Sequence, residues 1–175
     1  MAGCGSHSKG ELFFKNKKVF GVIGHSEKEN LQNLLQDNKS FYAIGNLEHI
    51  DSTILKNFIG KTRAFIKIQE GCDFDCSYCI IPSVRGDSRS HKESDVIKQI
   101  EILTDNGFSE FIFTGTNIAS YGDKINSSIA KLLKKISKIR GVKRVRIGSI
   151  EPVQIDDEFK ELLSESWMSR YLHIV

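Results

Sequence analysis

Three closely spaced cysteines, Cys72, Cys76 and Cys79, limit the chemistry of this chain more than any other feature. Three residues separate the first two, two separate the last two, and the remaining cysteine, Cys4, lies far away in the sequence. Three thiolates on one short loop can hold three corners of a cubic iron–sulfur cluster. The fourth iron then keeps an open position, where chemistry can take place. The spacing therefore predicts a reactive iron–sulfur centre.

A disulfide and a structural zinc site are two other uses of these cysteines. A disulfide would leave one of the three unpaired, and four cysteines in 175 residues are too few for a disulfide-stapled secreted domain. A structural zinc site usually needs four ligands. His91 could be the fourth, but it lies twelve residues beyond Cys79 and has no partner at metal-site spacing. Free thiolates predict a reducing compartment, the cytoplasm.

The bulk composition is that of an ordinary globular protein. A length of 175 residues fits one domain, or one domain with a piece of another. Hydrophobic residues make up 39% and charged residues 27%. No apolar run approaches the roughly 20 residues that span a bilayer, so no membrane association is expected.

Basic residues are concentrated in one segment. Nine lysines and arginines and no acidic residue lie between Lys124 and Arg146, although the whole chain has a net charge of only +3. Such a run is either the solvated face of a helix or a surface that contacts phosphates. The sequence leaves both interpretations open.

The order of secondary structure predicts an α/β fold with a parallel sheet. Alternating apolar residues and turn signals predict strands over 64–68, 110–114, 142–147 and 171–175. Helical periodicity predicts helices between them: one capped by Ser94 and ended by Asn106 and Gly107, one over about 127–140, and one capped by Asp156 or Asp157. Alternating strands and helices imply right-handed crossovers between parallel strands.

Three loops are expected at one edge of this sheet. The cysteine loop follows the first strand, residues 115–122 follow the second and residues 148–152 follow the third. Functional loops of parallel α/β folds follow the carboxyl ends of the strands. We therefore expect the three loops to share one rim.

Residues 1–60 contain few signals. One strand is predicted over 19–23, and one helix over about 27–35, with Ser26 as its cap and Glu29 at the capping-box position. This is too little for an independent core. The chain also ends inside an apolar strand and starts as if within a loop, so we expect it to be part of a longer protein.

Residues 71–86, GCDFDCSYCIIPSVRG, and then Ser88-Arg-Ser90 resemble the radical S-adenosylmethionine methylthiotransferases. Members of this family add a methylthio group to tRNA or to a ribosomal protein. The resemblance covers essentially the whole chain. It implies that residues 1–60 are the end of the family's N-terminal domain plus a linker, and that residues 61–175 are a truncated radical barrel.

Within the family, three runs are similar to the MtaB-type branch, which acts on threonylcarbamoyladenosine beside the tRNA anticodon. They are residues 65–72 (FIKIQEGC), 114–122 (TGTNIASYG) and 146–152 (RIGSIEP). Alternatives are the branches that modify isopentenyladenosine or a ribosomal-protein aspartate, and a radical enzyme with another substrate. A non-catalytic zinc or nucleic-acid-binding module is a further alternative.

The resemblance also implies site residues. Cys72, Cys76 and Cys79 would each bind one iron of a 4Fe–4S cluster, and S-adenosylmethionine would chelate the fourth iron. Tyr78 matches the aromatic position beside the adenine. Three rim residues and one residue of the cysteine segment are candidates for ligand contacts: Asn117, Ser149, Glu151 and Arg85.

Cys4 matches the third of three N-terminal cysteines that hold a second cluster in this family. The first two are absent from this chain, as is the RNA-binding domain that usually follows the barrel. The resemblance therefore implies that full activity needs more than these 175 residues. The partners it implies are tRNA and an electron donor such as flavodoxin or ferredoxin.

Overall fold

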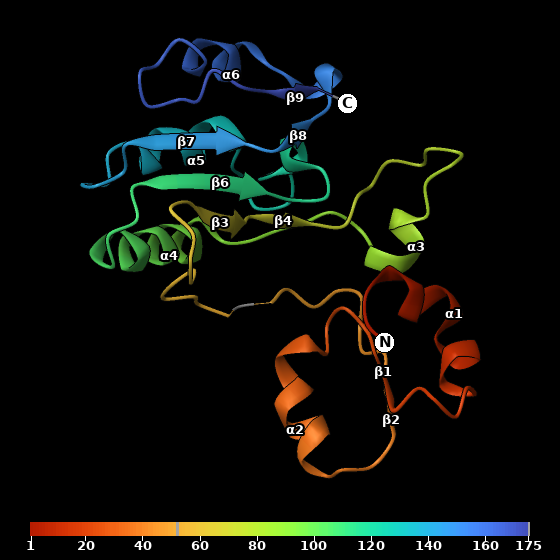
Figure 1. Ribbon diagram of the computed structural model, residues 1–175. Coiled ribbons are helices and arrows are strands. Elements are labelled where there is room, and N and C mark those ends of the chain that lie inside the picture. Colours follow the sequence, from red (N-terminus) through yellow and green to blue (C-terminus); the bar gives the residue numbers. More distant parts are fainter. Residues whose placement is uncertain (52, 175) are drawn as a thin grey trace. The chain divides into compact units, whose positions relative to one another are not determined.

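The computed structural model describes residues 1–51 and 53–174, and these divide into two compact units (Figure 1). The first unit comprises Met1–Thr53 and Gly71–Asp87, and the second comprises Ile54–Glu70 and Ser88–Val175. The chain therefore leaves the second unit after Glu70, contributes the cysteine segment to the first unit, and returns at Ser88. No helix in the described residues is long and apolar enough to cross a membrane.

A parallel three-stranded sheet forms the centre of the second unit. Its order is β3 (Ala64–Lys67), β6 (Glu110–Thr114) and β7 (Arg144–Ile147). Two short strands, β8 (Ser149–Ile150) and β9 (His173–Ile174), also pair in parallel. An α/β fold with parallel strands is thus confirmed.

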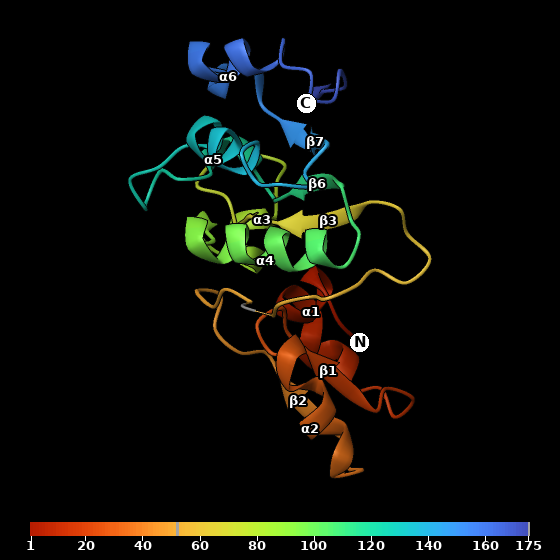
Figure 2. The same ribbon diagram turned by 90° about the vertical axis from the view of Figure 1, so that its left-hand side faces the viewer.

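Helices cover one face of this sheet. Figures 1 and 2 show α4 (Glu93–Asp105) and α5 (Ile129–Ile136) on the same side of the strands, and α6 (Asp157–Leu162) follows β8 in the chain. Every second strand residue points into the core beneath them, including Ile66, Phe111, Phe113, Val145 and Ile147. Burial of this apolar surface is the main stabilising contribution.

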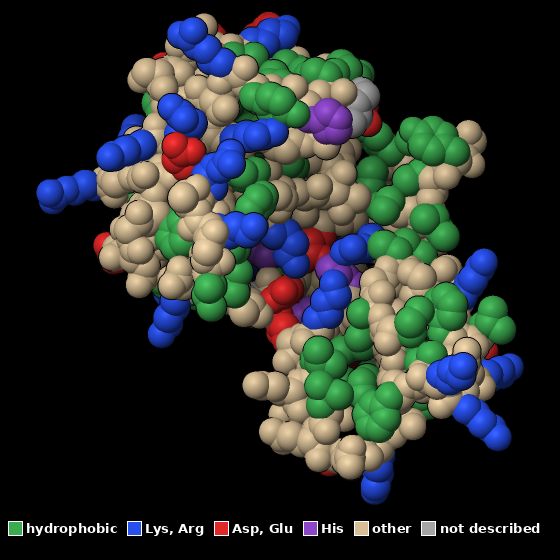
Figure 3. All heavy atoms as spheres, viewed as in Figure 1, with side chains coloured by type: hydrophobic (Ala, Val, Ile, Leu, Met, Phe, Trp, Pro, Cys, Tyr) green, Lys and Arg blue, Asp and Glu red, His purple; other side chains and the backbone are tan. Residues whose placement is uncertain are grey.

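The other face of the sheet is open. Phe65 on β3 is 47% exposed, and Arg146 on β7 stacks over the ring of Tyr171 with its guanidinium carbon 3.7 Å from the ring centroid. Basic side chains gather over these strands in the space-filling view (Figure 3). Strands that alternate buried and half-exposed residues are typical of a sheet covered on one side.

Side chains cap the first turn of two helices in the second unit. Asp156 caps α6, since its carboxylate accepts a bond from the amide of Phe159 at 2.7 Å. Ser128 caps α5 by accepting from the amide of Lys131 at 3.1 Å. The prediction of Ser94 as a cap was wrong. Helix α4 starts at Glu93, with Lys92 at the N-cap position, and the Ser94 hydroxyl donates to Asp95.

Several predicted elements are shorter in the structure. The helix expected over 127–140 ends at Ile136, and the strand expected over 142–147 starts at Arg144. The strand expected over 64–68 ends at Lys67, because β4 (Gln69–Glu70) then pairs antiparallel with β5 (Arg89–Ser90). The last strand is reduced to His173–Ile174, and position 175 lies outside the described residues.

The first unit contains more structure than the sequence indicated. Its elements are α1 (Cys4–Phe14), β1 (Gly21–Ile23), η1 (Lys28–Asn30), α2 (Leu31–Gln36), β2 (Phe41–Ala43) and α3 (Ile81–Arg85). Strand β1 pairs in parallel with β2. Helix α1 and strand β2 were missed.

The predicted capping box in the first unit was wrong. Ser26 does not cap a helix, because its hydroxyl donates to the carbonyl of Ile44 at 3.4 Å. The 3₁₀ turn η1 contains Glu29, and α2 begins only at Leu31 without a side-chain cap.

Glu93 ties α4 to α5 and makes the stability of the second unit dependent on pH. The Ser127 hydroxyl and the Lys135 ammonium both donate to its carboxylate, and these bonds lower the pKa of Glu93. A carboxylate whose folded pKa is depressed stabilises the fold above its unfolded pKa, and this stability is lost as the pH falls through the folded value.

We therefore predict that Glu93→Gln lowers the melting temperature at neutral pH and flattens the loss of stability between about pH 5 and pH 3. Thermal unfolding followed by circular dichroism across this range tests the prediction. Glu161→Gln, a change at an exposed position of α6, is the control. Equal pH profiles for Glu93→Gln and the unaltered protein would contradict it.

Candidate active site

One backbone hydrogen bond joins the two ends of the cysteine segment, and another forms a turn within it. The amide of Cys72 donates to the carbonyl of Gly86 at 3.1 Å, and the amide of Cys79 donates to the carbonyl of Cys76 at 2.9 Å. Gly71 has a φ of 70°, and a Cβ at this position would lie 1.9 Å from the carbonyl oxygen of Asp87. Only glycine fits here, because both the left-handed backbone and the close approach exclude a side chain.

The three cysteines of the loop form no disulfide within the described part of the chain, and Cys76 is exposed while Cys72 and Cys79 are partly buried. No three His, Cys, Asp or Glu side chains among the described residues come together around a single metal ion. A cubic cluster does not require this, since each of its cysteines binds a different iron. Three reduced thiols on one accessible loop therefore provide a suitable donor set for such a cluster.

Arg85, at the end of α3, connects the cysteine segment to Cys4. Its Nε donates to the Cys4 sulfur at 3.2 Å, although 81 residues separate the two in sequence. Its Nη1 lies 2.9 Å from Nδ1 of His25. The amide of His25 in turn donates to Nε2 of His7 at 3.2 Å, and burial, with His25 and Arg85 nearby, lowers the pKa of His7. The first unit thus brings Cys4 and the segment after Cys79 together.

In the second unit, Gln69 holds together the strand ends from which the cysteine segment leaves. Its side chain is 1% exposed. The amide nitrogen donates to the Ser88 hydroxyl at 3.0 Å and to the carbonyl of Glu70 at 2.9 Å. The amide oxygen accepts from the backbone of Asn117 at 2.8 Å. One buried side chain therefore connects the β4–β5 pair to the loop after β6.

Next to it lies a buried carboxylate surrounded by basic groups. Glu70 is 2% exposed, and Lys67 Nζ lies 2.5 Å from its Oε1. Arg89 and His91 approach the same carboxylate at 3.8 and 3.9 Å. Paired charges offset the cost of burying the carboxylate. The Tyr121 hydroxyl donates to the carbonyl of His91 at 3.0 Å, and burial raises the pKa of Tyr121.

Sequence reasoning missed Gln69 and Glu70. Two polar residues directly after an apolar strand were the available signal, because polar groups that continue a buried strand must find partners.

The remaining candidate residues differ in burial. Asn117 is buried, whereas Tyr78 is 91% exposed in this conformation. Ser149 on β8 is partly buried, and its hydroxyl lies 2.7 Å from Nδ1 of His173. Glu151 immediately precedes the 3₁₀ turn η3 (Pro152–Gln154). Asn117 lies on the loop after β6, and Ser149 and Glu151 lie on and directly after β8, all in the second unit, while Tyr78 and Cys72, Cys76 and Cys79 belong to the first.

Comparison with known proteins identifies the class. The profile of the radical SAM superfamily matches residues 66–174, which cover the cysteine loop and the parallel sheet. The chain therefore belongs to the radical SAM superfamily, whose members use a 4Fe–4S cluster and S-adenosylmethionine. The fold agrees with this. The radical S-adenosylmethionine methyltransferase TsrM from Kitasatospora setae superposes on 63% of this chain and 22% of its own, with a TM-score of 0.50 and 20% identity.

Within the superfamily, several similar sequences are named as methylthiotransferases. A putative methylthiotransferase of Helicobacter pylori strain J99 is 53% identical over 176 residues, which cover 99% of this chain and 42% of the relative. The threonylcarbamoyladenosine tRNA methylthiotransferases MtaB of Rickettsia prowazekii and Bacillus subtilis are 34% and 45% identical, over 95% and 67% of this chain and 41% and 27% of theirs. The chain thus spans about two-fifths of the length of the H. pylori relative.

Proposed function

We propose that this chain is the radical centre of a tRNA methylthiotransferase that acts on threonylcarbamoyladenosine next to the anticodon. One observation of the structure carries the proposal. Arg85, six residues after Cys79, donates to the sulfur of Cys4. A methylthiotransferase needs its second cluster beside its radical centre, and this contact brings a cysteine of the N-terminal segment to the cysteine segment within one compact unit.

In this proposal Cys72, Cys76 and Cys79 hold the cluster, and Cys4 contributes one ligand to a second cluster whose other ligands lie outside this chain. When bound to these cysteines and reduced, such a cluster would supply the electron for cleavage of a carbon–sulfur bond of S-adenosylmethionine. The chain binds and orients this ligand, with Tyr78 against the adenine and Asn117, Ser149 and Glu151 as polar contacts. Gln69 keeps the loop that carries Asn117 next to the stem of the cysteine segment.

We further propose that the protein works in the cytoplasm and receives its electron from a flavodoxin or a ferredoxin. Residues 1–60 are the end of an N-terminal methylthiotransferase domain with a linker, and residues 61–175 are part of the radical domain.

A second candidate substrate is isopentenyladenosine-type tRNA. A tRNA-2-methylthio-N(6)-dimethylallyladenosine synthase of Hydrogenobaculum is 32% identical over 99% of this chain. The MtaB relatives from R. prowazekii and B. subtilis reach 34% and 45%, which favours threonylcarbamoyladenosine.

Nucleoside mass spectrometry of tRNA from cells with and without the intact gene tests the function. We expect the methylthio form of threonylcarbamoyladenosine to disappear on deletion and to return when the gene is restored. Loss of the isopentenyladenosine product instead would contradict the substrate but keep the family reaction. If neither nucleoside changes, tRNA is not the substrate.

A further inference from the structure

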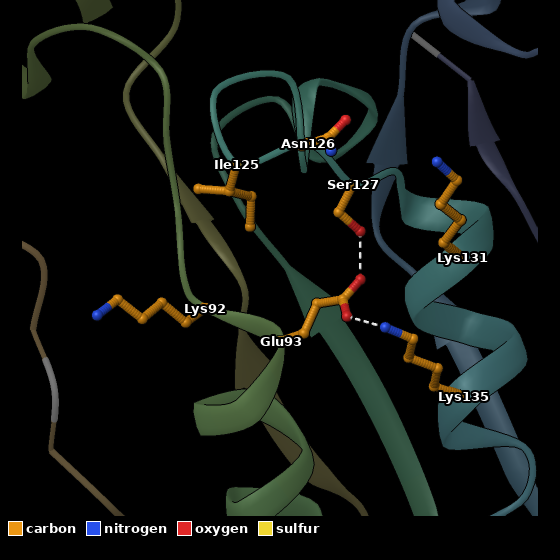
Figure 4. A pocket seen from close by; sticks show the side chains of 7 residues that line it. All are labelled: Lys92, Glu93, Ile125, Asn126, Ser127, Lys131 and Lys135. Atoms are coloured by element: carbon orange, nitrogen blue, oxygen red, sulfur yellow. Dashed lines mark hydrogen bonds and ion pairs between the residues drawn. The ribbon is translucent and has the colours of Figure 1, made fainter.

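A hollow of about 280 Å³ lies in the second unit, between the start of α4, the loop before α5, and α5 itself. Seven residues line it: Lys92, Glu93, Ile125, Asn126, Ser127, Lys131 and Lys135. Figure 4 shows Glu93 in the middle, between Ser127 and Lys135, with Lys92 and Lys131 at opposite margins. None of these residues belongs to the candidate active site described above.

The hollow lies at the functional edge of the sheet. Loop 115–128 follows the carboxyl end of β6, and both α4 and α5 begin beside the hollow, at Glu93 and Ile129. In parallel α/β folds the helices begin at the edge where the strands end, and ligands bind there. The amino ends of helices carry partial positive charge, which adds to that of the lysines.

The charge of the hollow remains positive after its internal pairing. Glu93 is engaged by Lys135 and by Ser127, so its one negative charge is used within the protein. Lys92 and Lys131 are exposed, and the ammonium group of neither forms a hydrogen bond or an ion pair within the described part of the chain. Two ammonium groups thus face solvent across a fixed carboxylate.

Some other basic residues of segment 124–146 are already paired with carboxylates. Lys134 is paired with Glu158 at 3.0 Å, and Arg144 lies 3.3 Å from Glu110. A lysine that already pairs with a carboxylate gains less from a phosphate, because the existing pair must be broken first. Among the basic residues of the segment with no ion pair in the described part of the chain, Lys131 is the one that lines the hollow, and Lys92 joins it from outside the segment.

Resting on the proposed tRNA substrate, we propose that this hollow binds the sugar–phosphate backbone of the RNA. Two lysines at opposite margins suit successive phosphates of an extended strand better than one small anion. Ile125, which is 36% exposed, offers an apolar surface for a ribose between them. Such contacts position the RNA but do not select the base, which the loops of the rim must read.

The test neutralises the two unpaired lysines in the complete protein. Lys92→Gln/Lys131→Gln should raise the dissociation constant of unmodified tRNA transcript about tenfold and reduce its salt slope by about two, one per lysine. The matched control is Lys98→Gln/Lys138→Gln, which removes the same charge from two exposed positions outside the hollow, one on α4 and one two residues after the end of α5. Circular dichroism and thermal unfolding confirm that both variants are folded.

An unchanged dissociation constant in the hollow variant overturns the proposal. An equal loss of tRNA affinity in the Lys92/Lys131 variant and in the control also overturns it, because equal losses indicate diffuse electrostatic attraction and not a defined binding site. Inorganic phosphate at constant ionic strength separates the two sources of phosphate: displacement of tRNA at millimolar concentration would assign the hollow to a free anion and overturn the RNA assignment. Weaker tRNA binding in the Lys92→Gln/Lys131→Gln variant alone supports RNA binding in the hollow. This result would stand even if nucleoside analysis found no methylthio product, so the RNA-binding proposal and the proposed reaction can fail independently.

Discussion

Alanine at any one of Cys72, Cys76 or Cys79 should abolish the visible absorption of the anaerobically reconstituted protein. The unaltered chain should bind about four irons and four sulfides. Each cysteine is expected to hold a different iron, so the loss of one opens a second corner of the cluster to solvent and to oxidation. Iron and sulfide analysis with visible spectroscopy measures the effect, which should be nearly complete for each variant.

Cys4→Ala is the matched control for this experiment. Cys4 is also a free, partly buried thiol, but it lies on α1, where Arg85 donates to it. Its replacement should leave the iron content of this chain unchanged. If a variant with alanine at Cys72, Cys76 and Cys79 together keeps its iron while Cys4→Ala loses it, the ligand assignment is wrong. A colourless protein that binds one zinc ion would support a structural metal site instead.

Gln69→Leu should destabilise the second unit by about 3 kcal/mol. The buried amide bonds the Ser88 hydroxyl, the carbonyl of Glu70 and the amide of Asn117. Leucine has a similar volume but leaves these groups unsatisfied, and each buried group without a partner costs roughly 1–3 kcal/mol. Equilibrium unfolding in urea, followed by circular dichroism, measures the change.

Gln32→Leu is the control for this prediction, because Gln32 is exposed on α2 in the other unit. It should leave the midpoint of unfolding within about 0.5 kcal/mol of the unaltered value, as is usual for surface changes. Equal midpoints for Gln69→Leu and Gln32→Leu would contradict the central role of Gln69. A loss confined to Gln69→Leu would support it.

The sequence predicted the second unit well because its signals are local. The strand over 110–114 is β6, residue for residue, since its strand-forming residues Phe111, Ile112 and Phe113 and the turn signal of Gly115 lie within a few residues of one another. The apolar stripe of α5 and the Asp156 cap of α6 were likewise readable from neighbouring residues. The cap of α4 was not, because several polar residues precede the apolar stripe and Ser94 bonds Asp95 instead.

The first unit was predicted poorly because its elements depend on distant contacts. Helix α1 has almost no apolar stripe, and Lys9 interrupts its helical backbone with φ −138°. Strand β2 spans only three residues and is defined by its pairing with β1. Short elements of this kind are fixed by tertiary partners and not by intrinsic propensity.

The sequence by itself determined the chemistry, because three thiols within eight residues need no fold to share one loop. It also determined the alternation of strands and helices that makes a parallel sheet. Only the tertiary structure decided which residues act together across the chain. Arg85 meets Cys4, Gln69 meets Asn117, and Lys92 shares a hollow with Lys131. Such contacts join residues about 40 to 80 positions apart, and they depend on how the elements pack, which no local pattern encodes.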